Sequence, residues 1–251
     1  MARLNVQTIK AGLSGLQIGS EIELFDQLPS TMDRARERLP SPGYLVLAEA
    51  QTEGRGKRGR VWESPRGEDL YFSFLTGPID KSASPFAITL AVGLGIAEGA
   101  EALTGVEALV KWPNDVRLNE RKIAGILVES NGDLAEGVIV GAGINVNRQR
   151  FPEELEGKAS SLALEAGRRF HREEALIAML RAVDARVREF IERGPGHIVR
   201  ALNERLALLH QQVRVGDHIG RVYGVSGSGA LMLEAGGVIT EIVAGTLEPL
   251  D

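Results

Sequence analysis

The sequence predicts an α+β fold, with a mixed or antiparallel central sheet flanked by helices and a small all-β domain after it. Up to about residue 209, short runs typical of strands are interspersed with stretches of helical spacing. From about His210 the chain consists of short β-branched runs separated by Gly, Asp and Ser, which predicts five short strands in a small barrel. The 251 residues suffice for one medium and one small domain, which we expect at 1–208 and 209–251.

Two helices and two strands are expected in the first 52 residues. The helix over 4–14 has helical spacing, and the strand over 21–28 alternates between apolar and polar side chains. The stretch PSTMDRARERL (29–39) predicts a turn and a short amphipathic helix with Ser30 or Thr31 as N-cap. Prolines and a glycine then end this helix, and an apolar strand is expected over 44–52.

The middle of the chain predicts a sheet with one buried helix. We expect a strand over 69–76, a helix over 84–103, a strand over 106–112, a hairpin over 115–130 and a glycine-rich strand over 136–147. The expected helix has few charges, which is typical of a helix buried on most sides. Residues 159–209 are rich in Ala, Leu, Arg and Glu and predict mainly helix.

Composition excludes several classes of protein. Acidic residues outnumber basic ones by 34 to 29, so the chain as a whole does not have the charge of a polyanion binder. The absence of cysteine removes disulfides, thiol nucleophiles and cysteine-based metal sites. We expect a soluble cytoplasmic protein, because the N-terminus lacks a secretory signal pattern and the longest apolar stretch, 86–97, is too short to span a bilayer.

The stretch EGRGKRGRVW (Glu53–Trp62), called the Gly/Arg loop below, places three glycines among four cations between two expected strands. Its glycines satisfy G-x-G-x-x-G, but that dinucleotide motif must lead into a helix, and here a second strand follows. A Walker loop fails because Lys57 is followed by Arg58 rather than Ser or Thr. A nucleic-acid patch, a solvated mobile loop and a site for a nucleotide anion remain open.

The chemistry of the loop favours the nucleotide among these alternatives. Glycines let backbone amides approach an anion, and arginine supplies a planar pair of donors for carboxylate or phosphate. Trp62 adds a ring on which a base can stack.

Two further stretches carry polar side chains at strand ends. In VKWPNDV an apolar strand delivers Lys111, followed by a turn that contains Asn114. In GAGINVN the residues Asn145 and Asn147 end another apolar strand, and an asparagine amide can bind an adenine edge. Each stretch alone fits a strand cap or a structural asparagine equally well.

Taken together, AEAQTEGRGKRGRVWESP, VKWPNDVRLNERKIAGILVE and VGAGINVN resemble the biotin–protein ligases in order and spacing, from about residue 5 to the C-terminal barrel. The resemblance implies a class II synthetase-like catalytic domain with an SH3-like C-terminal barrel. It also implies ATP-dependent attachment of biotin, through biotinyl-5′-AMP, to a lysine of a biotin carboxyl carrier domain. Magnesium is expected on the ATP phosphates, and no dedicated metal site is expected in the protein.

The resemblance assigns roles to specific residues. Lys111, Arg55 and Lys57 are expected to be catalytic, with Lys111 between the biotin carboxylate and the α-phosphate. The residues expected to bind biotin are Ser30, Thr31, Met32, Gln51, Arg55, Gly56, Lys57 and Lys111. Those expected to bind ATP or the adenylate are Gly54, Arg58, Arg60, Trp62, Asn114, Lys122 and Asn145. The loop is expected to be mobile until an anionic ligand orders it.

The chain departs from the family pattern at two positions. Met32 stands where many members have asparagine, and Lys57 stands where arginine is frequent, so the loop keeps a charge but loses a bidentate donor. Fewer than 30 residues precede Ser30, too few for the DNA-binding domain of dual-function members, so we expect a monofunctional enzyme without DNA binding.

A homodimer is a further expectation from the resemblance, and the expected partners include no membrane. The alternatives are a lipoate or octanoate ligase of the same fold, and a non-catalytic module that binds nucleotide, nucleic acid or biotin.

Overall fold

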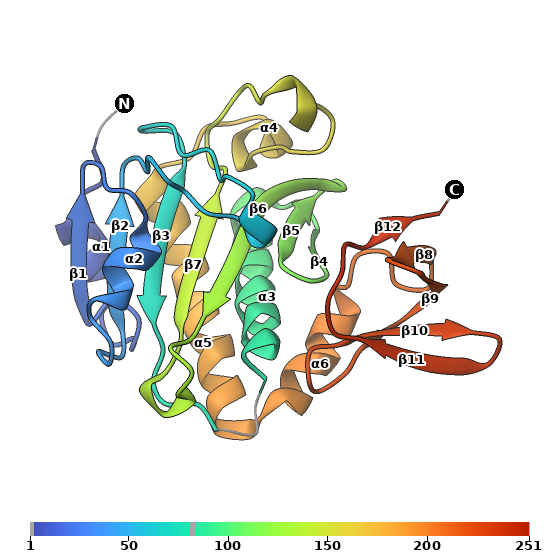
Figure 1. Cartoon of the computed structure of the whole chain (residues 1–251). Helices are drawn as coiled ribbons and strands as arrows, with labels where there is room; N and C mark the ends of the chain where they lie inside the picture. The colour runs from blue at the N-terminus through green and yellow to red at the C-terminus, as the bar shows by residue number, and fades with distance from the viewer. Residues whose placement is uncertain (1–2, 81–83, 251) are drawn as a thin grey trace.

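A computed structural model describes residues 3–80 and 84–250 and shows two β-sheets joined by helices (Figure 1). The first sheet has seven strands in the order β1-β2-β3-β7-β6-β5-β4. It is mixed, because β1 and β2 run parallel while the other neighbours are antiparallel. Its strands are β1 (Glu21–Phe25), β2 (Tyr44–Ala48), β3 (Leu70–Leu75), β4 (Ala108–Lys111), β5 (Asp115–Leu118), β6 (Arg121–Glu129) and β7 (Ile139–Ile144).

Alternation along the strands divides the buried residues between the two faces of this sheet. In β2, Leu45 and Leu47 belong to the main core, whereas Tyr44 and Val46 belong to a smaller cluster that includes Met32 of the short helix α2. The helices are α1 (Val6–Gly12), α2 (Thr31–Arg36), α3 (Pro85–Thr104), α4 (Leu162–Ala166), α5 (Arg172–Arg193) and α6 (Pro195–Glu204). Figure 1 shows α3 and α5 together behind the sheet, opposite α2.

Helices α3 and α5 approach closely because α3 carries glycines at the contact. A Cβ atom at Gly95 would lie 2.6 Å from the Cα atom of Val183, and one at Gly99 would lie 2.7 Å from the Cα atom of Met179. By length and composition Phe86–Thr104 would suffice to cross a membrane, but 72% of its most apolar window is buried inside the protein. The helix therefore serves as a core helix, as its all-round apolar sequence predicted.

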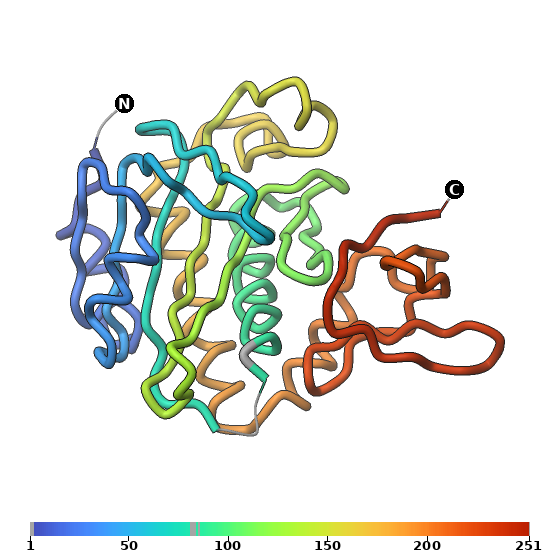
Figure 2. The backbone as a smooth tube through the Cα atoms, in the orientation of Figure 1, coloured from blue at the N-terminus to red at the C-terminus, as the bar shows by residue number. Residues whose placement is uncertain are grey.

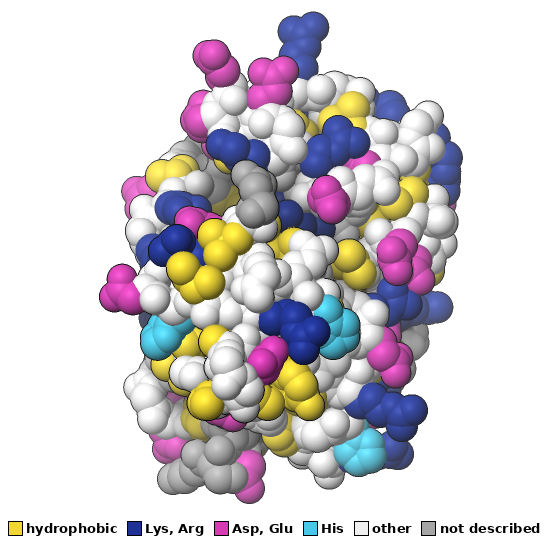
Figure 3. All heavy atoms as spheres, turned by 90° about the vertical axis from the view of Figure 1, so that its right-hand side faces the viewer, with side chains coloured by type: hydrophobic (Ala, Val, Ile, Leu, Met, Phe, Trp, Pro, Cys, Tyr) yellow, Lys and Arg dark blue, Asp and Glu magenta, His cyan; other side chains and the backbone are white. Residues whose placement is uncertain are grey.

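The second sheet follows α6 and is antiparallel, in the order β11-β10-β9-β8-β12. Its strands are β8 (Gln212–Val215), β9 (His218–Val225), β10 (Leu231–Ala235), β11 (Val238–Ile242) and β12 (Glu248–Pro249), which confirms the five expected strands. Inward side chains such as Val222 and Leu233 join the main core, and the outer face carries scattered apolar and charged side chains (Figure 3). The indole N–H of Trp112, which follows β4, donates to Gly229 O at 3.1 Å and ties the two sheets together.

The other expected elements are present with shifted ends. The strand expected over 44–52 ends at Ala48, and beyond it only Gln51 of this range pairs again, as an isolated bridge with Leu28. The buried Glu49 between them pairs with Arg172 at 2.9 Å. The strand expected over 136–147 ends at Ile144. The helical region breaks at Gly167 and Gly194, whose φ angles of 66° and 78° favour glycine.

Candidate active site

A cavity of about 370 Å³ lies on the face of the first sheet under the Gly/Arg loop. The loop leaves β2 and crosses to β5 and β6, as the backbone trace shows (Figure 2). The cavity is also lined by the start of α2, the turn after β4, segment 148–159 and segment 245–247. Every site residue expected from the sequence lines it except Gly54.

Gly54 supports the base of the loop instead of lining the cavity. A Cβ atom at this position would lie 2.4 Å from Trp62 O and 3.1 Å from the side-chain nitrogen of Gln51. Only glycine leaves room here for the two ends of the loop to pair, with Trp62 N–H donating to Gly54 O at 2.8 Å.

Glycines of β6 and β7 form the floor of the cavity. A Cβ atom at Gly143 would lie 2.3 Å from the Trp62 indole, and one at Gly125 would lie 2.8 Å from the same ring. At Gly141 a Cβ atom would lie 2.7 Å from the Met32 side chain. The glycines therefore let an aromatic ring lie directly on the sheet, which explains the glycine-rich strand of the sequence.

One end of the cavity is a buried network of hydroxyl and amide groups. Ser30 caps α2, since its Oγ accepts from the Met32 N–H. The Gln51 carbonyl oxygen accepts from the Thr31 N–H at 2.8 Å, and the Gln51 amide donates to Ser64 Oγ at 3.0 Å. Ser30 and Thr31 are each 3% exposed, so this end can bind a compact polar group away from water. Met32 belongs to the adjacent apolar cluster and forms a wall rather than a polar contact.

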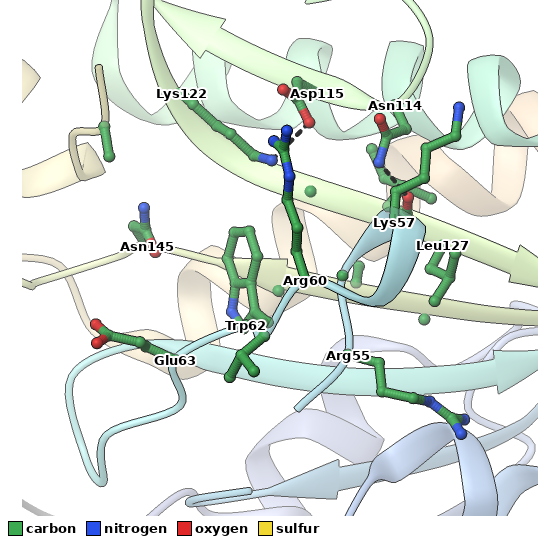
Figure 4. Close-up of a pocket in the computed structure, with 18 of the residues that line it drawn as sticks. Arg55, Lys57, Arg60, Trp62, Glu63, Asn114, Asp115, Lys122, Leu127 and Asn145 are labelled. Carbon is green, nitrogen blue, oxygen red and sulfur yellow. Dashed lines mark hydrogen bonds and ion pairs between the residues drawn. The ribbon is translucent and has the colours of Figure 1, made fainter. Parts of the chain in front are cut away.

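The opposite side of the cavity carries cations. Lys122 Nζ lies 2.6 Å from Asp115 Oδ1, and Lys111 is the ladder partner of Asp115 across the β4–β5 hairpin. Burial lowers the pKa of Lys111, and the nearby Arg117 guanidinium lowers it further. Figure 4 shows Lys122, Asp115 and Arg60 converging beside Trp62.

The other cations of the loop reach three separate elements. The Arg55 guanidinium pairs with Asp33 of α2 at 2.8 Å and points away from the cation group around Asp115 (Figure 4). The Lys57 ammonium lies 5.1 Å from the centre of the Phe86 ring and 5.9 Å from the Trp112 ring. Burial and the neighbouring Arg58 charge lower the pKa of Lys57.

The loop is folded back on itself above the cavity. It contains a short 3-10 turn, Lys57–Gly59, in which Arg58 has a left-handed φ of 59°. Gly56 N–H donates to Arg60 O at 2.7 Å, and Arg58 donates to the Thr246 hydroxyl at 3.0 Å.

Trp62 and Asn145 form a third part of the site. The Trp62 ring lies 5.3 Å from Lys122 Nζ, and its buried indole N–H has no hydrogen-bond partner among the described residues. The Asn145 amide donates to Ser160 O at 2.9 Å, and Asn114 donates to Ile126 O at 2.9 Å. Each asparagine is thereby held in one orientation at the cavity wall.

Asn147 has a structural role instead, because its side-chain nitrogen donates to Phe170 O and its side-chain oxygen accepts from the Phe170 N–H, each at 2.9 Å. The two asparagines of the sequence motif are therefore separated by the structure, and only Asn145 lines the cavity.

Sequence reasoning missed two arginines of the cavity. Arg148 is buried and pairs with Asp69 at 2.8 Å and Glu63 at 3.2 Å, which holds the segment after Trp62 in place. Its position directly after GINVN is the only signal in the sequence, since Asp69 is 79 residues away. Arg117 lies two residues after Asp115, on the same side of an alternating strand.

Within residues 3–80 and 84–250, no three His, Cys, Asp or Glu side chains come together as a metal site would require.

Comparison with known proteins gives concordant matches. Residues 24–145 match the model of the Biotin/lipoate A/B protein ligase family. The chain is 32% identical to the Bifunctional ligase/repressor BirA of Bacillus subtilis, over 98% of this chain and 79% of that protein. It is 28% identical to the Biotin--[acetyl-CoA-carboxylase] ligase of Mycobacterium tuberculosis, over 96% and 92%. The biotin protein ligase from Aquifex aeolicus in complex with biotin and ATP superposes with a TM-score of 0.82 at 31% identity, covering 91% of this chain and 98% of that one.

Proposed function

Because the chain belongs to the biotin/lipoate A/B protein ligase family, we propose that it attaches biotin to a lysine of a biotin carboxyl carrier domain through biotinyl-5′-AMP. Biotin and ATP are its small-molecule substrates, with Mg²⁺ accompanying the ATP phosphates. The observation that carries the proposal is that one cavity joins a buried hydroxyl and amide end, a group of cations and an aromatic ring on a glycine floor.

The buried polar end suits the ureido head of biotin. A ureido group has two N–H donors and one carbonyl acceptor, which the hydroxyls of Ser30 and Thr31 and the Gln51 amide can match. Met32 and the glycine floor then border the apolar rings and chain of biotin. Gly56, Arg55 and Lys57 belong to the loop that would close over the valeryl chain and its carboxylate.

The cation group suits the first step of the reaction. An oxygen of the biotin carboxylate attacks the α-phosphorus of ATP, the bond to the bridging oxygen breaks, and pyrophosphate leaves with the electron pair. Both reactants are anions, so fixed cations must neutralise them and hold them in line. Lys111 and Lys122 flank Asp115 and would supply this positive charge, to which Arg58 and Arg60 of the loop would add.

In the second step the amine of the acceptor lysine attacks the acyl carbon of the mixed anhydride and AMP leaves. We propose that Trp62 packs on the adenine, while Asn145 and Asn114 bind polar groups of the nucleoside. The closed loop would exclude the water that otherwise hydrolyses the anhydride. An ATP-dependent enzyme of this kind acts in the cytoplasm, which we propose as its location.

The nearest alternative is a lipoate or octanoate ligase of the same family. The buried Ser30, Thr31 and Gln51 network favours biotin, because a dithiolane or an alkyl chain offers it no hydrogen-bond partner. These groups already bond one another and Ser64, so a ureido group could add hydrogen bonds to them, whereas a dithiolane or an alkyl chain would gain none.

We would test the function by incubating the protein with biotin, Mg-ATP and a biotin carboxyl carrier domain and reading the mass of the carrier. We expect an ATP-dependent gain of one biotinyl group, and a rate about a hundredfold lower for Lys111→Ala. Arg200→Gln is the control, because this side chain is 89% exposed and lies outside the cavity.

Two outcomes would contradict the proposal. A mass gain with octanoate or lipoate but not with biotin would assign the chain to the lipoate branch of the family. Absence of acylation with all three acids would leave a module that binds nucleotide or biotin without catalysis.

A further inference from the structure

Arg117 lines the cavity from the β4–β5 hairpin and has no part in the roles described above. Along this hairpin, Val110 and Val116 point into the core, whereas Lys111, Asp115 and Arg117 alternate with them and are half-buried on the cavity side. The ladder pairs Lys111 with Asp115 and places Arg117 beside Lys122 of β6. The four charged groups therefore share one patch of the sheet.

The guanidinium of Arg117 is only partly satisfied. One terminal nitrogen donates to Glu120 O at 2.9 Å, while the buried Nε has no hydrogen-bond partner among the described residues. By contrast, the buried Arg148 and Arg172 pair with Asp69 and Glu49 at 2.8 and 2.9 Å. A half-buried guanidinium whose Nε lacks an acceptor is costly unless a ligand completes its bonding, and the Asp115 and Glu120 charges only partly offset this cost.

The charges of the patch do not balance. Among the described residues, Asp115 is the one carboxylate that forms an ion pair with a cation of the patch, with its Oδ1 atom 2.6 Å from Lys122 Nζ. Lys111 and Arg117 consequently remain in excess. They are close enough for the Arg117 charge to lower the pKa of Lys111, an effect that Asp115 opposes and Glu248 opposes more weakly. A patch with three cations and one bound carboxylate at a cavity wall is suited to an anion of high charge.

We infer that Arg117 binds the β- and γ-phosphates of ATP and the pyrophosphate that leaves, next to Lys111 at the α-phosphate. The inference rests on the proposed function and assigns a separate place to each part of the nucleotide. The Lys122 ammonium lies beside Trp62 and Gly125, at the nucleoside and α-phosphate, whereas Arg117 lies two residues beyond Asp115 along β5. When the bond from the α-phosphorus to the bridging oxygen breaks, the electron pair stays on pyrophosphate, which Arg117 holds.

This assignment predicts that Arg117 distinguishes ligands by their phosphates. AMP and biotin lack the β- and γ-phosphates, so Arg117→Gln should leave their affinities unchanged. Mg-ATP and Mg-pyrophosphate should bind roughly tenfold to a hundredfold more weakly, as for loss of a charged hydrogen bond. Arg117→Lys keeps the charge without the planar fork and should recover part of the loss.

Isothermal titration calorimetry of the full chain tests the inference, with Mg-ATP, Mg-pyrophosphate, AMP and biotin each titrated alone. The wild type is compared with Arg117→Gln, Arg117→Lys and the charge control Arg200→Gln. Unchanged biotin affinity in Arg117→Gln shows at the same time that the variant is folded.

An Arg117→Gln variant that binds Mg-pyrophosphate and Mg-ATP as the wild type does would overturn the inference alone. Equal losses for AMP and ATP would also overturn it, because Arg117 would then act through the nucleoside or through the fold of the hairpin. A wild-type protein that binds neither biotin nor ATP would overturn the proposed function instead.

Discussion

Two lysines of the cavity are held in places that disfavour their own charge. Lys57 lies over the Phe86 and Trp112 rings, where the Arg58 charge outweighs that of Asp115, and Lys111 faces Arg117 as well as Asp115. Burial is the main cause that lowers the pKa of both ammonium groups. An anionic substrate would restore the lost stabilisation, so each lysine contributes more to a bound phosphate or carboxylate than an exposed lysine would.

The lowered pKa of Lys111 gives a pH dependence with a definite sign. A lysine is charged below its pKa, so the charge of Lys111 is lost as pH rises through a value below the ordinary 10.5. We expect kcat/KM for ATP to fall on the alkaline side before an ordinary lysine would titrate. In Lys111→Arg, which stays protonated, this alkaline limb should move to higher pH. The measurement is the rate of carrier biotinylation across pH 6–10.5.

The pH profile of Lys57→Arg is compared with that of Lys111→Arg to assign the alkaline fall in kcat/KM to one of the two lysines. If the limb moves with Lys57→Arg and not with Lys111→Arg, the titrating cation is in the loop rather than on β4. A limb that neither substitution moves would contradict a role for both lysines.

At the scale of the elements, the Gly/Arg loop is fastened at both sides of the cavity. Arg55 binds Asp33 on α2, while Lys57 packs on Phe86 and Trp112, and Arg58 donates to Thr246 before β12. The family resemblance predicts a loop that is mobile until ligand binds, and that mobility stays a prediction. To open, the loop would have to break the hydrogen bond between Arg58 and Thr246, which joins it to the second sheet.

The rate of limited cleavage by trypsin reports on this opening, since the loop contains four trypsin sites. Thr246→Val removes the acceptor for Arg58, and we expect loop cleavage to be about two- to fivefold faster than in the wild type, as for loss of one exposed hydrogen bond. Mass spectrometry of the fragments locates the cut between 55 and 61. Thr240→Val, an exposed change on β11, is the control. Equal cleavage rates in the two variants would show that Thr246 does not hold the loop closed.

At the scale of the whole molecule, both sheets share one core. Val213, Val222 and Leu231 of the second sheet belong to the same buried cluster as Trp112 and the helices behind the first sheet. We propose that the boundary expected at residue 208 separates two sheets that do not unfold independently. Whether two copies of the chain pair, as the resemblance predicts, stays a prediction.

Differential scanning calorimetry should therefore show one cooperative transition, with equal calorimetric and van't Hoff enthalpies. Trp112→Phe removes the bond to Gly229 O and part of the shared packing, at a cost of about 2 kcal/mol. The single transition should then shift down as a whole by about 4–8 °C. Two separated transitions, of which only one responds to the substitution, would indicate independent domains.

Much of the fold and of the site was predictable from local patterns. The strand over 69–76, the buried helix over 84–103 and the hairpin over 115–130 follow from periodicity and turn chemistry, which act over a few residues. The expected site residues line one cavity, apart from Gly54. Arg148 and Arg117 were missed, because their importance depends on partners in other strands.

Local sequence patterns suffice for the order of the elements, for the glycines that leave room for a ring and for the cations available to an anion. Which of these groups meet depends on the folding of the whole chain. The tertiary structure separated Asn145 from Asn147, turned Arg55 toward Asp33 and left the Arg117 Nε atom without a hydrogen-bond partner in the described part of the chain. The physical reason is that periodicity and propensity are local, whereas such contacts depend on sheet register and on packing between residues far apart in the chain.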